Sequence, residues 1–190
     1  MDLLSILGSR NRNGQTAQAA QAFLRGAIAA GAETEELFLT HISLDNCRQC
    51  DDNGWGICRS EGRCVIDDDF QTVVQLIRSA DAVVFATPVY FSDLSESMKA
   101  FLDRVRRITR HENGLSKIEG KPAVGICVAG GGGGGAPQCA LNMEKTLRTC
   151  GFDVVDTIPV RRQNLEVKCA VLETTGEWLV ERNPGTADTP

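Results

Sequence analysis

Short apolar stretches alternate along the chain with longer segments whose apolar residues recur at helical spacing. The short stretches predict five buried strands, at residues 3–7, 36–39, 81–87, 123–129 and 152–160. The longer segments predict five helices, at residues 15–30, from 70 onward, and at 98–108, 139–149 and 166–181. Strands that alternate with helices in this way form a parallel sheet with helices on both faces.

The predicted architecture is a three-layer α/β sandwich of flavodoxin-like type. For a chain of 190 residues with five predicted strands, the expected order of the parallel sheet is 2-1-3-4-5. We expect one domain over residues 1–182, with a cysteine-rich insertion at 41–66. Residues 183–190 contain turn-forming residues and no apolar pattern, which predicts a loose C-terminal tail.

Composition and charge narrow the function classes. The chain has 20 Lys and Arg residues against 25 Asp and Glu residues, a net charge of −5, which argues against a general nucleic-acid binder. No apolar run is long enough to span a bilayer, and the acidic Asp2 and the lack of a basic segment argue against a signal peptide. We therefore expect a cytoplasmic protein whose eight cysteines serve metal binding, redox chemistry or packing rather than disulfides.

The loop after the first predicted strand has the composition of an anion-binding site. Ligands of such sheets bind at the carboxyl ends of the strands. This loop combines small residues, two arginines and hydroxyl side chains at the start of a helix, where backbone N–H groups attract anions. The candidate phosphate-binding residues are Ser9, Arg10, Arg12, Gly14, Gln15 and Thr16. An ordinary capped turn between strand and helix is the alternative.

Two further loops at the same edge are unusual. After the third strand the candidates are Pro88, Val89, Tyr90 and Phe91, which present apolar and aromatic surface where loops are usually polar; the alternative is that the two rings pack into the core. After the fourth strand stand six glycines, of which Gly130, Gly131, Gly132 and Gly133 are candidates, because glycine lets the backbone approach a ligand closely. A phosphate cradle, an aromatic platform and a glycine wall together favour FMN as the ligand.

The motifs resemble those of a known family. The first loop contains Gly-Ser and Gly-x-Thr, as the first loop of that family does. A Thr-Pro-Val-Tyr segment is followed by a helix with Lys-x-x-x-Asp-Arg, which is the family's second motif. The matching positions are Gly8, Ser9, Gly14, Thr16, 87–90, Lys99, Asp103 and Arg104. In these features the chain resembles the NAD(P)H-dependent FMN reductases and iron–sulfur flavoproteins of the flavodoxin-like group. Arg10 and Asn11 stand where that family has Pro and Arg.

The resemblance implies an activity. FMN would take a hydride from NAD(P)H and then reduce a flavin, a quinone or another small acceptor bound in the same pocket, in a ping-pong mechanism. No side chain needs to act as a general acid or base, so no catalytic residue is predicted. The resemblance also implies a homodimer or homotetramer. Lys99, Asp103 and Arg104 are expected to form ion pairs along one helix face, and His41 is expected to be a surface or hinge residue.

Four cysteines lie in the insertion, Cys47, Cys50, Cys58 and Cys64, with two, seven and five residues between them. Four thiolates can hold a [4Fe–4S] cluster or a zinc ion. The iron–sulfur members of the resembled family have a more compact spacing, which residues 52–56 enlarge here. The alternatives are zinc, a redox-active dithiol of Cys47 and Cys50, and free thiols. A cluster would favour a second function, an electron carrier between proteins such as ferredoxins. The other four cysteines, Cys127, Cys139, Cys150 and Cys169, are expected to pack in the core.

Overall fold

The structure, a computed structural model, describes residues 1–109 and 116–182. A five-stranded parallel sheet forms the centre of the molecule, with the strands in the order β2-β1-β3-β4-β5. The predicted flavodoxin-like topology is therefore confirmed. The strands are β1 (Asp2–Leu7), β2 (Glu33–Phe38), β3 (Ala82–Pro88), β4 (Pro122–Ala129) and β5 (Asp153–Arg161).

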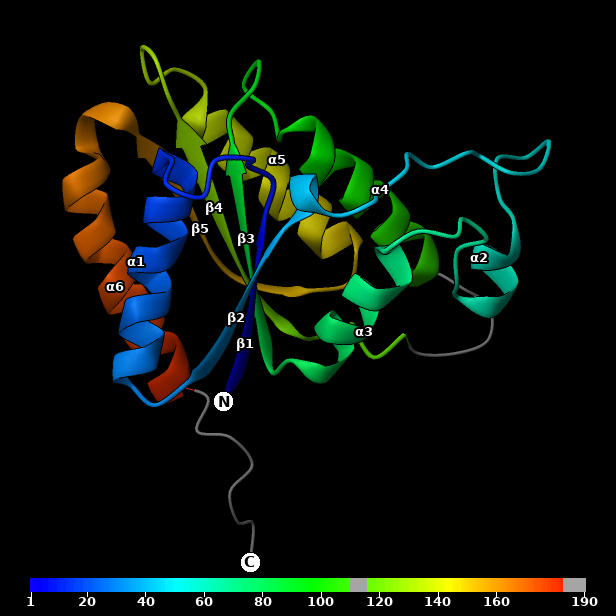
Figure 1. The fold of residues 1–190 in the computed structure, drawn as a ribbon, viewed down its shortest axis with the longest axis horizontal. Coiled ribbons are helices and arrows are strands. Elements are labelled where there is room, and N and C mark those ends of the chain that lie inside the picture. The colour runs from blue at the N-terminus through cyan, green and yellow to red at the C-terminus, as the bar shows by residue number, and fades with distance from the viewer. Residues whose placement is uncertain (110–115, 183–190) are drawn as a thin grey trace, which may run out of the picture.

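Helices cover both faces of this sheet (Figure 1). On one face lie α1 (Gln15–Ala29) and α6 (Leu165–Arg182); on the other lie α3 (Phe70–Ser79), α4 (Glu96–Thr109) and α5 (Ala136–Thr149). Each face has its own apolar core, centred on residues such as Phe23 and Leu172 on the first and Phe85 and Phe101 on the second. The sheet is thus buried on both faces, as its nearly continuous apolar strands require.

Two helices of the first face touch through their backbones. A Cβ atom built on Gly26 of α1 would lie 1.8 Å from the carbonyl oxygen of Glu173, and one on Gly176 of α6 would lie 2.1 Å from the carbonyl oxygen of Phe23. No side chain fits between the helices at either position. The two glycines therefore allow α1 and α6 to cross at a distance that larger residues forbid.

The structure corrects two predicted boundaries and adds one helix. Strand β2 begins at Glu33 and ends at Phe38, whereas the sequence predicted 36–39. Because β2 is an edge strand with one fully buried residue, its apolar signal is weak. Helix α5 begins three residues earlier than predicted, directly after the glycines. The cysteine-rich segment, predicted as a loop, contains a short helix, α2 (Ile57–Glu61). The predicted tail, residues 183–190, lies outside the described residues.

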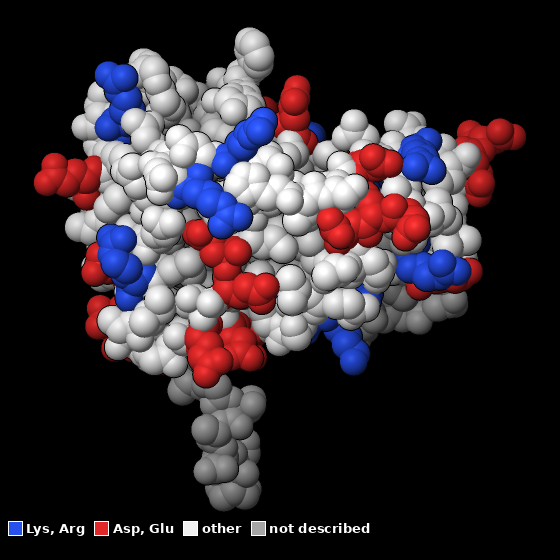
Figure 2. All heavy atoms as spheres, in the orientation of Figure 1, with Lys and Arg blue, Asp and Glu red and all other residues white. Residues whose placement is uncertain are grey.

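Charged side chains of both signs occur on the surface, as the similar numbers of basic and acidic residues lead one to expect. On the face shown in Figure 2, acidic and basic side chains are interspersed, without a continuous basic surface. Within the described residues, no helix is both long and apolar enough to cross a membrane.

Candidate functional site

Three loops meet at the carboxyl ends of β1, β3 and β4. The amide of Gly8 donates to the carbonyl oxygen of Ala86 (2.9 Å), which ties the end of β1 to β3. A Cβ atom on Gly130 would lie 3.9 Å from Oε1 of Gln15, and one on Gly135 would lie 2.6 Å from Oγ of Ser92. The glycine loop (residues 130–135) therefore lies beside the first loop on one side and beside the aromatic loop (residues 88–93) on the other. The fold brings together the three segments that the sequence singled out.

The first loop (residues 8–14) begins in a tightly packed place. The carbonyl oxygen of Gly8 accepts hydrogen bonds from Oγ of Ser95 (2.9 Å) and Oγ of Ser97 (3.3 Å). A Cβ atom on Gly8 would lie 2.4 Å from the Ser95 oxygen, so only glycine fits. Ser95 also bonds the side chain of Thr87 (3.1 Å). Neither serine was among the predicted site residues, because hydroxyl residues at the start of a helix do not indicate which carbonyl oxygen they reach.

The end of the first loop leaves the start of α1 open. The Asn11 side chain accepts a hydrogen bond from the amide of Asn13 (3.0 Å), and its carbonyl oxygen accepts one from the amide of Gly14 (3.1 Å). Gly14 is the N-cap of α1 and provides no side-chain cap. The amides of the first turn are therefore not capped by the residue that usually satisfies them. Such amides can bind an anion.

A short 3-10 helix after β2, residues Leu39–His41, holds the first loop from outside. Oγ1 of Thr40 donates to the carbonyl oxygen of Ser9 (3.1 Å). Nε of Arg12 donates to Nδ1 of His41 (3.3 Å), whose Nε2 lies 3.0 Å from the carbonyl oxygen of Arg10. Only a ring that carries its hydrogen on Nε2 serves both partners. His41, predicted as a surface or hinge residue, is exposed but also anchors this loop.

The aromatic loop ends in a tight turn. Tyr90 and Asp93 exchange both backbone hydrogen bonds, each of 2.9 Å, around Phe91 and Ser92, whose φ values are 50° and 65°. Two consecutive residues with positive φ are typical of a type I′ turn. Phe91 is fully exposed and Tyr90 is 54% exposed. The alternative that the rings pack into the core is therefore wrong for this chain.

The glycine loop is folded back on itself. The amide of Gly133 donates to the carbonyl oxygen of Gly130 (2.8 Å), and Nε2 of Gln163 donates to that of Gly131 (3.2 Å). Gly131, Gly133 and Gly135 have positive φ. These contacts make the loop an ordered turn rather than a loose connector, and they explain three of the glycines directly.

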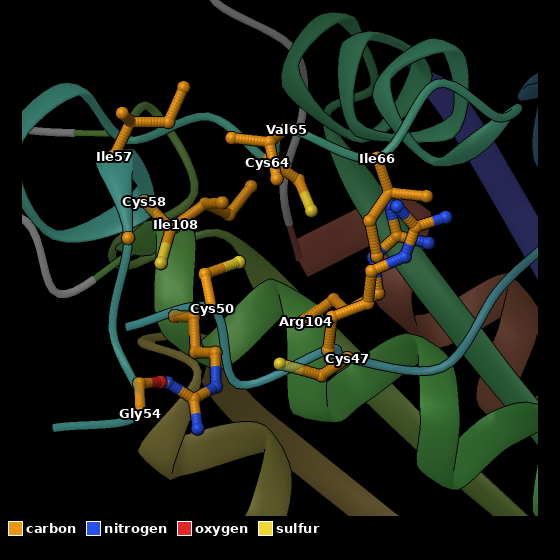
Figure 3. A pocket seen from close by; sticks show the side chains of 13 residues that line it. Cys47, Cys50, Gly54, Ile57, Cys58, Cys64, Val65, Ile66, Arg104 and Ile108 are labelled. Carbon is orange, nitrogen blue, oxygen red and sulfur yellow. The ribbon is translucent and has the colours of Figure 1, made fainter. Parts of the chain in front are cut away.

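The four cysteines of the insertion line one pocket (Figure 3). Cys58 belongs to α2, whereas Cys47, Cys50 and Cys64 lie in the flanking loops. Apolar side chains of Ile57, Val65, Ile66 and Ile108 complete much of the wall. The sulfur atoms face a common space, but over the described ranges no three or more His, Cys, Asp or Glu side chains stand close enough to form a metal site. The pocket thus has the donors of a metal site without its closed arrangement.

Residues 51–56, which include the segment 52–56 that lengthens the cysteine spacing, form an ordered turn. The amide of Gly54 donates to the carbonyl oxygen of Asp51 (2.7 Å), and the amide of Asp51 donates to that of Trp55 (2.9 Å). A Cβ atom on Gly56 would lie 3.0 Å from Cβ and 3.3 Å from Sγ of Cys50. The turn therefore packs directly against one of the four thiols.

Arg104 connects this segment to α4. Its side chain is 1% exposed and makes a two-point contact with the Asp68 carboxylate, through Nη1 at 2.5 Å and Nη2 at 2.8 Å. Burial alone would lower the pKa of Arg104, but its contacts with Asp68 and Cys64 outweigh burial and raise that pKa. Burial alone would raise the pKa of Asp68, but hydrogen bonds from Arg104 and from two backbone amides lower it. The pair is therefore charged.

This contact corrects one prediction. Arg104 was expected to join Lys99 and Asp103 in ion pairs along the helix face. Lys99 and Asp103 do pair, at 3.9 Å, but Arg104 points into the core toward Asp68. The charged partner lies 36 positions earlier in the sequence, so helical spacing could not reveal it.

The remaining cysteines are mostly core residues, as predicted. Cys127, Cys139 and Cys150 are fully buried, and Cys169 is partly buried. The adjacent thiol of Cys139 and burial both raise the pKa of Cys127. A raised pKa keeps this thiol in its neutral form.

Comparison with known proteins decides the family. The model of a family described as NADPH-dependent FMN reductase matches residues 1–163. The chain belongs to this family. Family membership supports an FMN-dependent oxidoreductase, and the three loops of the candidate site all lie within the matched residues.

Within the family, similar curated relatives are iron–sulfur flavoproteins. One from Methanocaldococcus jannaschii is 30% identical over 131 residues, which are 69% of this chain and 65% of that protein. One from Methanosarcina thermophila is 28% identical over 155 residues, 82% of this chain and 77% of the relative. The chain thus spans about two thirds to three quarters of the length of these relatives.

Solved structures confirm the fold. A NAD(P)H:quinone oxidoreductase from Methanothermobacter marburgensis superposes with a TM-score of 0.68 at 21% identity, and the match covers 94% of this chain and 96% of that one. An archaeal flavodoxin superposes with a TM-score of 0.64 at 12% identity, and the match covers 97% of this chain and all of the flavodoxin. At these identities the likeness concerns the flavodoxin-like architecture.

Proposed function

We propose that the three converging loops bind FMN. The first loop and the start of α1 would hold the phosphate through backbone amides and the residues Ser9, Arg10, Arg12, Gly14, Gln15 and Thr16. The aromatic loop would line the flavin ring and ribityl chain with Pro88, Val89, Tyr90 and Phe91. Gly130, Gly131, Gly132 and Gly133 would close the opposite side. The observation that carries this proposal is the uncapped start of α1 beside the two other loops.

The proposed reaction is a ping-pong transfer in which NAD(P)H and a small acceptor, such as a quinone or a free flavin, occupy the same pocket in turn. Bound FMN would supply the hydride acceptor and donor. The chain would bind and orient the two substrates and exclude water. No general acid or base is required of it. Tyr90 and Phe91 are exposed beside the site, which leaves space for a second planar ring.

The phosphate assignment is tested by fluorescence titration of FMN. Replacing Ser9 and Thr16 with Ala is expected to weaken binding about tenfold or more, because hydrogen bonds to a charged group contribute about 1.5–3 kcal/mol. Ser79→Ala with Thr175→Ala is the matched control, because these hydroxyls bond only carbonyls of their own helices. Equal affinities in the two double variants would refute the phosphate site. Stopped-flow reduction by NADPH and NADH then tests the proposed reaction.

We also propose that Cys47, Cys50, Cys58 and Cys64 hold a [4Fe–4S] cluster. Two observations support this: the four thiols line one pocket, and the relatives named above are iron–sulfur flavoproteins. A bound cluster would supply one-electron chemistry. The chain would then act as an electron carrier that exchanges electrons with proteins such as ferredoxins, which is the second candidate function.

The cluster is tested on protein purified without oxygen. About four irons per chain and a broad visible shoulder beneath the flavin bands are expected, and both should disappear in the Cys50→Ser, Cys58→Ser variant. Cys169→Ser serves as control. Flavin bands without iron would support the FMN reductase function and reject the electron-carrier function. Retained iron in the double variant would reject the assigned ligands.

We propose further that the chain forms a homodimer or homotetramer. The exposed rings of Tyr90 and Phe91 favour such an assembly, because a second copy could cover them. Light scattering coupled to gel filtration measures the mass directly. A monomer at micromolar concentration would refute the assembly.

A further inference from the structure

Two buried N–H groups at the cysteine pocket lack a hydrogen-bond acceptor in the described part of the chain. They are the Nε groups of Arg104 and Arg107, and both arginines line the pocket (Figure 3). Buried donors without partners are rare and costly. Two of them at one pocket indicate that its occupant accepts hydrogen bonds.

Nε is the one nitrogen of the Arg104 guanidinium that has no hydrogen-bond partner among the described residues. Nη1 donates to Asp68 and to the carbonyl oxygen of Asp45 (3.0 Å), and Nη2 donates to Asp68. The guanidinium lies 4.1 Å from the centre of the Phe70 ring. The Cys64 thiol lies close enough to act on the guanidinium. The group is thus fixed on three sides beside a thiol of the pocket.

Arg107 is held by the residues that lengthen the cysteine spacing. Its Nη1 donates to the carbonyl oxygen of Gly54 (2.5 Å), and its guanidinium lies 4.8 Å from the centre of the Trp55 ring. Among the described residues Arg107 forms no ion pair. The enlarged turn therefore positions a guanidinium whose charge no carboxylate of the described residues neutralises.

The electrostatic character of the pocket selects an anion. Among the described residues that line it, three are arginines and none is Asp or Glu. A cluster held by four thiolates carries net negative charge, and hydrogen bonds to its sulfur atoms are one of the factors that set its reduction potential. We propose that Arg104 and Arg107 donate through Nε to the sulfur atoms of the cluster and its cysteines, and thereby raise its reduction potential.

The direction follows from charge. One-electron reduction adds a negative charge to the cluster and strengthens the hydrogen bonds that its sulfur atoms accept, so the Nε donors stabilise the reduced form more than the oxidised form. This inference rests on the proposed cluster. It assigns a purpose to the enlarged turn: residues 51–56 would hold Arg107 in place rather than disrupt the site.

The test is a potentiometric titration of the anaerobically purified chain with dithionite. The EPR signal of the reduced cluster is measured at each potential. Arg107→Lys keeps the charge but removes the Nε donor. Its midpoint potential is expected to fall by an amount equal to a tenfold change in the equilibrium constant, or 59 mV for one electron. Arg48→Lys is the matched control, because Arg48 lines the same pocket but is 63% exposed and paired with Asp45. Its potential should stay unchanged.

The outcomes separate the two proposals. A lower potential at full iron content in Arg107→Lys alone supports the inference, whereas loss of iron in that variant overturns it in favour of a purely structural role. Full iron content with equal potentials in both variants overturns it and leaves the cluster intact. Zinc or no metal in the wild-type chain rejects the cluster and this inference together, while the flavin spectrum still reports on the FMN site. Circular dichroism of each variant excludes misfolding as the cause.

Discussion

At the scale of single residues, the candidate site depends on side chains that do not face a cofactor. Thr40 and His41 bind the outer side of the first loop through backbone carbonyls of Ser9 and Arg10 and through Arg12. These contacts fix the direction of the loop and of one candidate phosphate ligand. Preorganisation of this kind lowers the entropy lost on binding.

Loss of these contacts should weaken FMN binding. For the Thr40→Val, His41→Ala double variant we expect about a fivefold increase in Kd, because each lost hydrogen bond contributes about 0.5–1.5 kcal/mol and only part of that reaches the ligand. Thr34→Val, in β2 at the opposite end of the sheet, is the control. Fluorescence titration gives both constants, and an unchanged Kd in the double variant would show that the loop needs no support.

At the scale of elements, the contact between α1 and α6 should not tolerate a larger residue at either of its two glycines. Gly176→Ala is expected to lower the free energy of unfolding by about 3 kcal/mol, because the added methyl group meets backbone that cannot move aside. Gly134→Ala is the matched control, since nothing lies within 4 Å of its Cβ position. Urea unfolding of both variants measures the difference, and a loss below about 1 kcal/mol would mean that the helices separate easily.

The buried pair of Asp68 and Arg104 connects the cysteine segment to α4 and should make stability depend on pH. The pKa of Asp68 is lowered in the folded chain, so its contribution is complete above the unfolded value, about 3.9, and is lost as pH falls through the lower folded value. Asp68→Asn should cost roughly 3 kcal/mol at pH 7, because it leaves Arg104 buried without its counter-charge. The difference from wild type should shrink in acid. Urea unfolding across this range measures it, and a difference independent of pH would contradict the assignment.

At the scale of the whole molecule, the sequence predicted what depends on local pattern. Strand order followed from five apolar stretches, and the three loops at one edge followed from that order. Contacts between distant residues were not predictable: Arg12 meets His41 across 29 positions, and Arg104 meets Asp68 across 36. The spacing rule that placed Arg104 beside Lys99 describes neighbours on one helix. It contains no information about the segments that pack against that helix.

Ligand binding should stabilise the whole molecule and distinguish FMN from its dephosphorylated form. At a concentration of 100 times Kd, FMN is expected to add about 2.7 kcal/mol, which raises Tm by roughly 5–10 °C for a chain of this size. Riboflavin, which lacks the phosphate, should give a much smaller shift at the same concentration. Differential scanning calorimetry measures both. Equal shifts would mean that the first loop does not bind phosphate.

The close crossing of α1 and α6 also has a consequence for synthesis. Gly26 and Gly176, which permit it, are 150 residues apart, and α6 is the last helix described. While the chain grows on a ribosome at about 5–20 residues per second, the first helix lacks its contact with α6 for roughly 8–30 s. The apolar face of α1 is exposed to the cell during that interval. Until α6 has been made, chaperones can therefore bind this face of α1.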